Sequence, residues 1–168
     1  MSNIITVNLE NLTDAERQQL MSLVEKSKKA KQWWEGTKFD IKENENYYTI
    51  LPSGGVEADR QFCTQVDGNR INFGNACKDR DYMERRAKEI KLYNLLSNFA
   101  EVVNEGWTPN WKDKYEEKYC LYYDCFQDKW HTIYTFFAKY PTEVYFKSKE
   151  LAQRAINEII LPFERGEL

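Results

Sequence analysis

The sequence has few residues that interrupt secondary structure, form disulfides or act as general bases. Its 168 residues include only seven glycines, four prolines, four cysteines and one histidine. So little glycine and proline excludes a collagen-like fibre or a low-complexity linker. No apolar run approaches the roughly 20 residues of a membrane-spanning helix, and Met1–Asn8 lacks the charged and apolar regions of a secretory signal. We therefore expect a cytoplasmic protein with free thiols.

Neither sign of charge dominates. The chain has 24 basic and 27 acidic residues and a net charge of −3. The wholesale basic excess of a duplex nucleic-acid binder is therefore absent. What the sequence has in surplus is aromatic: five Trp, eleven Tyr and nine Phe make up 15% of it. This surplus excludes an intrinsically disordered chain, which has few aromatic residues.

The residues that carry catalysis or bind metals are isolated from one another. His131 lies in a predicted strand with no partner nearby in sequence. Cys120 and Cys125 have the C-x4-C spacing of some zinc sites, but the other two thiols, Cys63 and Cys77, lie in a different part of the sequence. We therefore expect no catalytic residues, no metal and no cofactor. A small enzyme with an unrecognised site is kept as an alternative.

Residues 1–36 are predicted to form an N-terminal helix and connector. Thr13 and Glu16 have the spacing of a capping box at the start of this helix. Leu20, Leu23 and Val24 follow at helical spacing and form one narrow apolar stripe. Because so narrow a stripe does not stabilise an isolated helix, it must dock on the body or on another copy. We expect a homodimer through this helix, with docking within the chain as the alternative.

The rest of the sequence predicts an α+β fold of two antiparallel β-meander-plus-helix units, residues 47–104 and 107–168. The predicted strands are Tyr47–Leu51, Gln61–Val66 and Arg70–Phe73 in the first unit, and Lys118–Asp124, Lys129–Thr135 and Glu143–Phe146 in the second. Asp67-Gly68 predicts a hairpin turn, because both residues tolerate positive φ. The matching order of elements predicts an internal repeat.

Each predicted unit ends in a helix. The first runs over roughly Asp79–Val103, where apolar residues recur at helical spacing. The second follows Ser148, a preferred helix cap, and runs to about Leu161. Helices placed in this way would cover one face of each small sheet, which an isolated meander needs for stability.

Tryptophans lie beside lysines in the second half of the sequence. Trp107 and Trp111 share a predicted loop with Lys112, and Trp130 follows Lys129 in a predicted strand. Aromatic rings between cations can stack on single-stranded nucleic acid and neutralise it. Trp and Tyr are also the commonest anchors of protein interfaces. Because the overall charge is acidic, we favour a protein partner that contacts these five residues, with nucleic acid as the alternative.

Two segments resemble a known group of proteins. They are the run from Asn104-Glu105-Gly106-Trp107 to Lys118-Tyr119 and the run from Val144-Tyr145-Phe146 to Ile156. Together they are similar to small uncharacterised phage and prophage proteins of Gram-positive bacteria, over roughly residues 80–160. The shared pattern is an aromatic strand pair, then aromatic-Phe-x-Ser/Thr-x-Glu-x-Ala at the start of a terminal helix.

The resemblance implies a setting but no catalytic residues. Small acidic phage accessory proteins often inhibit host defence, and anti-CRISPR proteins are among them. By this analogy the protein is a phage-encoded inhibitor that docks on a host defence complex, such as a CRISPR effector, in the bacterial cytoplasm.

Overall fold

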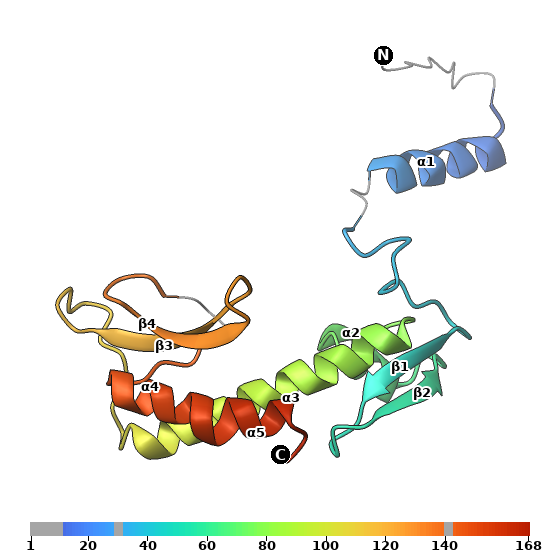
Figure 1. Ribbon diagram of the computed structural model, residues 1–168. Coiled ribbons are helices and arrows are strands. Elements are labelled where there is room, and N and C mark those ends of the chain that lie inside the picture. The colour runs from blue at the N-terminus through green and yellow to red at the C-terminus, as the bar shows by residue number, and fades with distance from the viewer. Residues whose placement is uncertain (1–11, 29–31, 140–142) are drawn as a thin grey trace. The chain divides into compact units, whose positions relative to one another are not determined.

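The structure, a computed structural model, describes residues 12–28, 32–139 and 143–168. It divides the chain into two compact units, Met1–Asp40 and Ile41–Leu168. Helices and two small antiparallel sheets of two strands each confirm the predicted α+β class (Figure 1).

Among the described residues, no helix is both long and apolar enough to span a lipid bilayer.

The Met1–Asp40 unit contains helix α1 (Asp14–Lys28), which begins where the sequence predicts. The Thr13 N–H donates to Glu16 Oε2 at 2.8 Å, and the Glu16 N–H donates to Thr13 Oγ1 at 3.4 Å, so the capping box is confirmed. On the apolar stripe, Leu23 is 57% exposed, while Leu20 and Val24 are half-buried. The stripe therefore keeps apolar surface for a further contact, and self-association through it stays a prediction.

The second unit begins with a hairpin of β1 (Asn46–Ile50) and β2 (Val56–Arg60). The first strand agrees with the sequence prediction. The predicted strands at Gln61–Val66 and Arg70–Phe73 are wrong, because residues 61–64 form no strand and helix α2 (Gln65–Asn72) follows them.

The predicted hairpin turn at Asp67-Gly68 is wrong for the same reason. Thr64 Oγ1 accepts the Asp67 N–H at 3.2 Å, and Asp67 Oδ2 accepts the Thr64 N–H at 3.0 Å. These two bonds form a capping box, which satisfies the free N–H groups of a starting helix. Asp67 is therefore the third residue of a helix, where its carboxylate also suits the positive end of the helix dipole.

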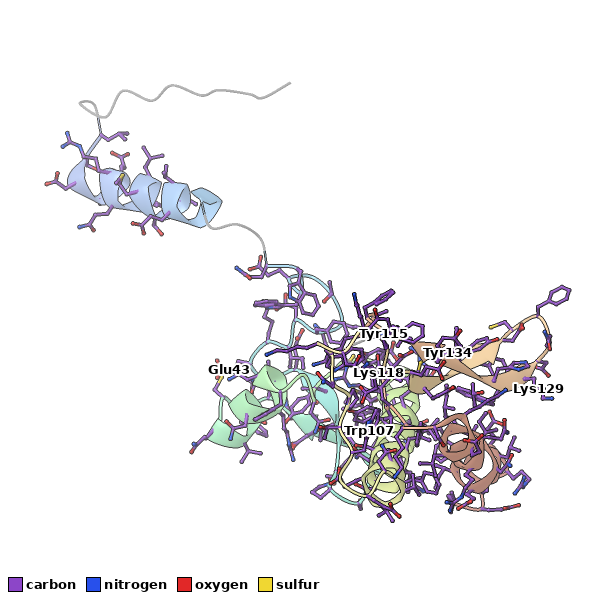
Figure 2. All side chains as sticks on the ribbon, turned by 90° about the vertical axis from the view of Figure 1, so that its left-hand side faces the viewer. Glu43, Trp107, Tyr115, Lys118, Lys129 and Tyr134 are labelled. Carbon is purple, nitrogen blue, oxygen red and sulfur yellow. The ribbon has the colours of Figure 1, made fainter. Side chains whose placement is uncertain are left out.

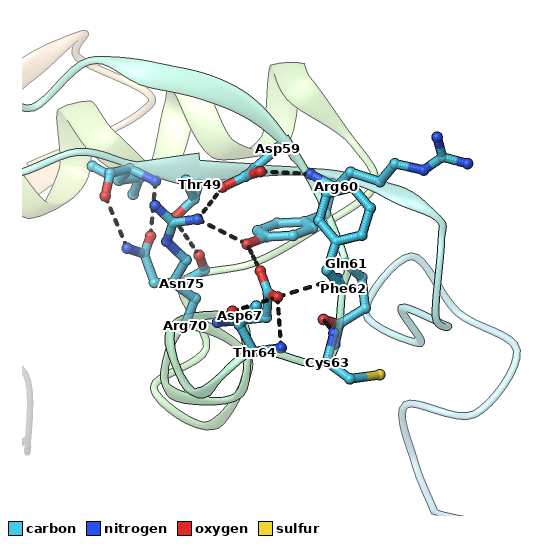
Figure 3. Close-up of polar contacts among 12 residues, drawn as sticks. Thr49, Asp59, Arg60, Gln61, Phe62, Cys63, Thr64, Asp67, Arg70 and Asn75 are labelled. Atoms are coloured by element: carbon cyan, nitrogen blue, oxygen red, sulfur yellow. Dashed lines mark hydrogen bonds and ion pairs between the residues drawn. The ribbon is translucent and has the colours of Figure 1, made fainter.

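A buried polar network fastens α2 to this hairpin (Figure 3). Tyr47 is fully buried, and its hydroxyl donates to Asp67 Oδ1 at 2.7 Å. Arg70 Nη1 donates to the Tyr47 hydroxyl at 2.9 Å and pairs with Asp59 on β2. Hydrogen bonds from Thr64 and Tyr47 lower the pKa of Asp67 to about 2. The network thus joins α2 to β1 through the buried Asp67 carboxylate and to β2 through Arg70.

We expect the protein to lose stability as the pH falls from about 4 towards 2. The ordinary pKa of Asp67 is 3.8, and the fold lowers it to about 2. A group whose pKa is lower in the folded state stabilises the fold above its unfolded pKa, and this contribution is lost as the pH falls through its folded pKa. Asp67→Asn should flatten this part of the curve. Urea unfolding followed by circular dichroism across this pH range measures the slope.

The exposed Glu57 provides the control for that experiment, because Glu57→Gln changes a carboxyl on the same hairpin outside the network. This variant should keep the wild-type slope. An Asp67→Asn protein with an unchanged slope would show that another group carries the acid sensitivity.

The rest of the second unit follows the sequence closely. Helix α3 (Arg80–Val103) begins after Asp79, whose Oδ1 accepts the Tyr82 N–H at 2.9 Å. Strands β3 (Lys118–Asp124) and β4 (Lys129–Thr135) have the predicted bounds. The β1–β2 and β3–β4 hairpins lie towards opposite ends of α3 (Figure 1).

The C-terminal helical segment has three parts. Helix α4 (Lys149–Ala155) follows the predicted cap Ser148, and a π-helical turn, η2 (Ile156–Ile160), leads into α5 (Leu161–Glu164). The predicted third strand Glu143–Phe146 forms only one antiparallel bridge, between Phe146 and Tyr119 of β3.

The two halves around α3 share one local arrangement. In each, a residue of the first strand bridges a buried residue, a lysine follows, and the next residue caps a helix. The matching residues are Tyr48, Cys77 and Asp79 in the first half and Tyr119, Phe146 and Ser148 in the second. The internal repeat stays an interpretation, in which α2 is an addition to the first half.

The core of the second half is formed where α3 meets α4. Phe146 and Ala152 are fully buried there, together with Ala100 of α3. Tyr119 and Leu121 pack against this cluster, so one face of β3 is directed towards the helices. Because side chains alternate along a strand, Tyr122 lies on the opposite face, which we call the outer face of the hairpin.

Candidate functional site

The structure does not bring the five predicted contact residues together. Trp107, Trp111 and Lys112 belong to the loop between α3 and β3, whereas Lys129 and Trp130 belong to β4. Trp107 and Lys129 lie well apart in Figure 2. The two groups are therefore described separately.

The two loop tryptophans make structural contacts. Trp107 Nε1 donates to Glu116 Oε1 at 3.0 Å. The Trp111 ring meets the Tyr145 ring edge-on at 5.1 Å between centroids, and Lys118 Nζ lies 5.4 Å from the Trp111 ring centroid. Both tryptophans are half-buried. They hold the loop in place, and contact with a partner through them stays a prediction.

The loop packs around a fully buried lysine, Lys118, the first residue of β3. Its Nζ donates to the Glu116 carbonyl at 2.8 Å and to the Asp113 carbonyl at 3.3 Å, and it pairs with Glu116 Oε2 at 3.0 Å. Burial alone would raise the pKa of Glu116, but hydrogen bonds from Lys118, Asn110 and Trp107 outweigh it and lower that pKa. The charged pair is thus structural, and the exposed Lys112 lies outside it.

Trp130 and Lys129 line a groove of about 640 Å³ between β4 and the C-terminal helical segment. Trp130 is half-buried, and its Nε1 donates to Glu164 Oε1 of α5 at 2.7 Å. Its ring meets Tyr123 of β3 edge-on at 5.3 Å. A groove of this volume lies in the range of known ligand sites.

The two walls of the groove differ in kind. The strand wall consists of Asp128 in the turn, the consecutive residues Lys129–Thr132 of β4, and Tyr123 of β3. The helical wall is a stripe of residues along the C-terminal helical segment: Lys149, Gln153, Ile156, Asn157, Leu161 and Glu164. The π-helical turn interrupts this wall, where the Leu161 N–H bonds to the Ile156 carbonyl five residues back. Such turns occur frequently at functional sites.

Sequence reasoning missed an exposed apolar surface on the β3–β4 hairpin. We call it the hairpin surface and define it by Tyr122, Phe126 and Ile133. They are 42%, 98% and 50% exposed. Phe126 occupies the turn, where Asp124 Oδ1 accepts its N–H at 2.8 Å, and Ile133 lies on the outer face beside its register partner Cys120, which is itself buried. The available signal was Phe126, a large apolar residue between two predicted strands, where a side chain has no hydrophobic core to pack into.

The structure places His131 and the Cys120 thiol against different side chains. His131 stacks on Tyr122 at 5.5 Å. Burial and the nearby Glu143 raise the pKa of the Cys120 thiol to about 12, so it stays protonated and is a weak nucleophile at neutral pH. Among the residues that the structure describes, no three His, Cys, Asp or Glu side chains are grouped to hold a metal ion.

Comparison of the chain with protein-family models, with curated proteins and with solved structures finds no match.

Proposed function

We propose that the protein is a non-enzymatic binding protein that docks a protein partner on the β3–β4 hairpin. The observation that carries this proposal is the exposure of three large apolar side chains, Tyr122, Phe126 and Ile133, on one hairpin. Single exposed apolar residues are normal on protein surfaces, but a group of them marks an interaction site. Aromatic side chains also supply most of the binding energy at protein interfaces.

The placement of the lysines favours a protein partner over single-stranded nucleic acid. Lys118 is buried and bonded to carbonyl groups of the preceding loop, so it is not available to a phosphate. Lys129 shares its groove with the carboxylates of Asp128 and Glu164. A track of cations along the aromatic rings, which nucleic acid requires, is therefore not supported.

The first partner to test is a host defence complex such as a CRISPR effector. This choice rests on the resemblance to phage and prophage proteins, whereas the choice of surface rests on the hairpin. In a strain with active CRISPR interference, expression of the protein should restore transformation by a targeted plasmid.

We expect the double variant Phe126→Ser and Ile133→Thr to weaken binding to the captured partner by at least about tenfold, because loss of anchor side chains costs more than about 1.4 kcal/mol. Capture from nuclease-treated lysate identifies the partner, and biolayer interferometry then measures its dissociation constant at low and high salt. Binding should change only mildly with salt, unlike phosphate contacts, which weaken by orders of magnitude.

Phe73→Ser is the matched control, because Phe73 is 85% exposed but lies at the end of α2. It should leave the affinity unchanged. Equal weakening by the control, loss of the partner on nuclease treatment, or a steep salt dependence would each refute the proposal.

A further inference from the structure

Strand β4 forms one edge of its sheet. On the other side of β3, the Tyr119 N–H donates to the Phe146 carbonyl at 3.0 Å, and the Phe146 N–H donates to the Tyr119 carbonyl at 2.8 Å. Both backbone groups of Tyr119 therefore point away from β4. In an antiparallel ladder, the backbone groups of successive residues point alternately towards and away from the partner strand. When one residue points away from its partner strand, the residue opposite it does the same. Tyr134, the register partner of Tyr119, thus directs its N–H and carbonyl away from β3.

The same alternation extends along β4 to Thr132 and Trp130, which lie two and four residues from Tyr134. Their N–H and carbonyl groups also point away from β3. Within the described part of the chain, these groups form no hydrogen bond. An edge of this kind is a template for a further strand.

This open edge faces the groove. Side chains of consecutive strand residues alternate between the two faces of a sheet. Four consecutive residues of β4, Lys129–Thr132, line the groove, so side chains from both faces of the sheet reach it and the edge of β4 borders it. Tyr123 of β3 lines the groove as well. The helical wall stands opposite. A groove between a strand edge and a helix is the form in which domains bind an extended peptide by adding it to the sheet.

The charges of the groove are mixed. Lys129 and Lys149 form no ion pair with any described carboxylate. Asp128 accepts a hydrogen bond from the Tyr123 hydroxyl, and Glu164 accepts one from Trp130 Nε1. Both carboxylates lie towards the turn end of β4, because their donors Tyr123 and Trp130 are register partners there. The two carboxylates offset the two lysines, so the groove has no excess of cations to attract a polyanion, while Lys149 remains open to a single carboxylate.

We infer that the groove binds an extended peptide segment of the protein partner as an added strand on β4. The backbone of the segment hydrogen-bonds to Trp130 and Thr132, and one acidic side chain of the segment faces Lys149. This inference rests on the proposed function and deepens it, since it gives the partner's bound form.

The first experiment leaves the protein unchanged and varies the ligand. A display library of random peptides of about twelve residues is selected on the full chain. Selected peptides should contain an acidic residue at one fixed position, and their binding should shift the Trp130 and Thr132 amide resonances. Two series of peptides are N-methylated, one at the odd and one at the even residues. The series in which the N–H groups facing β4 are methylated should bind about tenfold or more weakly, because these groups are the donors of the added strand. Failure to select a peptide, or equal binding by both methylated series, overturns the inference.

The second experiment changes the protein. Thr132→Pro removes an outward N–H at an edge position, where proline is tolerated. Lys149→Glu reverses the charge that is expected to face the acidic side chain of the peptide. Lys112→Glu is its control, because Lys112 is exposed and lies outside the groove. The first two variants should each weaken the selected peptide about tenfold, and the control should leave it unchanged. A β4–β4 dimer as the true occupant would appear as concentration-dependent association that the peptide does not reverse, and this result overturns the inference.

The two proposals can fail separately. Suppose that the partner is lost on changing Phe126 and Ile133 but is retained by Thr132→Pro and Lys149→Glu. The proposed function then stands and the strand-addition inference falls. If the partner is retained by all of these variants, both fall.

Discussion

Replacement of Lys118 by alanine is expected to lower the free energy of unfolding by about 3–5 kcal/mol, the range for breaking a buried ion pair by removing one partner. The lysine is fully buried and supplies hydrogen bonds to two carbonyl groups and one carboxylate. Its removal leaves Glu116 charged beside an empty space and frees the loop that carries Trp107. Urea unfolding followed by circular dichroism measures the loss.

Lys112→Ala is the control within the same loop, because Lys112 is exposed. It should change the free energy of unfolding by no more than about 0.5 kcal/mol, as is usual at such positions. Similar losses for the two variants would mean that the buried contacts of Lys118 contribute little to stability.

Phe146→Ala is expected to cost a similar amount, about 3–5 kcal/mol, by loss of apolar contacts and creation of a cavity. Phe146 is fully buried between α3 and α4, and its backbone bridges Tyr119 of β3. Its ring also meets that of Phe99 at 6.4 Å. The substitution keeps the backbone bridge, so the loss reports on the side chain alone. Thermal and urea unfolding both measure it.

Two further variants make this expectation specific. Phe146→Leu fills most of the cavity and should cost clearly less than the alanine change. Phe137→Ala removes a phenylalanine that is 77% exposed and should have little effect. A Phe137 variant as unstable as the Phe146 variant would contradict the assignment of the core.

Local signals in the sequence were sufficient for several elements. The Thr13 capping box and the continuous aromatic and β-branched runs of β3 and β4 are short-range features, and the structure keeps them at the predicted bounds. The region after β2 was mispredicted because two local signals compete there. Asp67-Gly68 favours a turn, whereas Thr64 and Asp67 favour a helix start, and the helix also gains the buried bond from Tyr47, twenty residues earlier.

The candidate site was only partly accessible to sequence reasoning. Trp130 and Lys129 were singled out and do line the groove. Lys149 and Gln153 were not, because they reach the groove only when the C-terminal helical segment packs beside β4. Conversely, Trp107 and Trp111 were predicted as contacts, yet their partners Glu116 and Tyr145 hold them within the fold. A tryptophan in a sequence packs equally well against its own chain or against a partner, so its presence alone does not distinguish the two.

The length of α3 has a consequence for how this protein can vary. Met83 near its start is buried in the first half, and Ala100 near its end belongs to the core around Phe146. The two residues are seventeen positions apart, which is about 25 Å at the rise of an α-helix. Substitutions that far apart, with no shared neighbours, change stability additively. Substitutions around the β1–β2 hairpin therefore do not disturb the packing of the β3–β4 hairpin. The β3–β4 hairpin can change with its partner without compensating substitutions at the other end of α3.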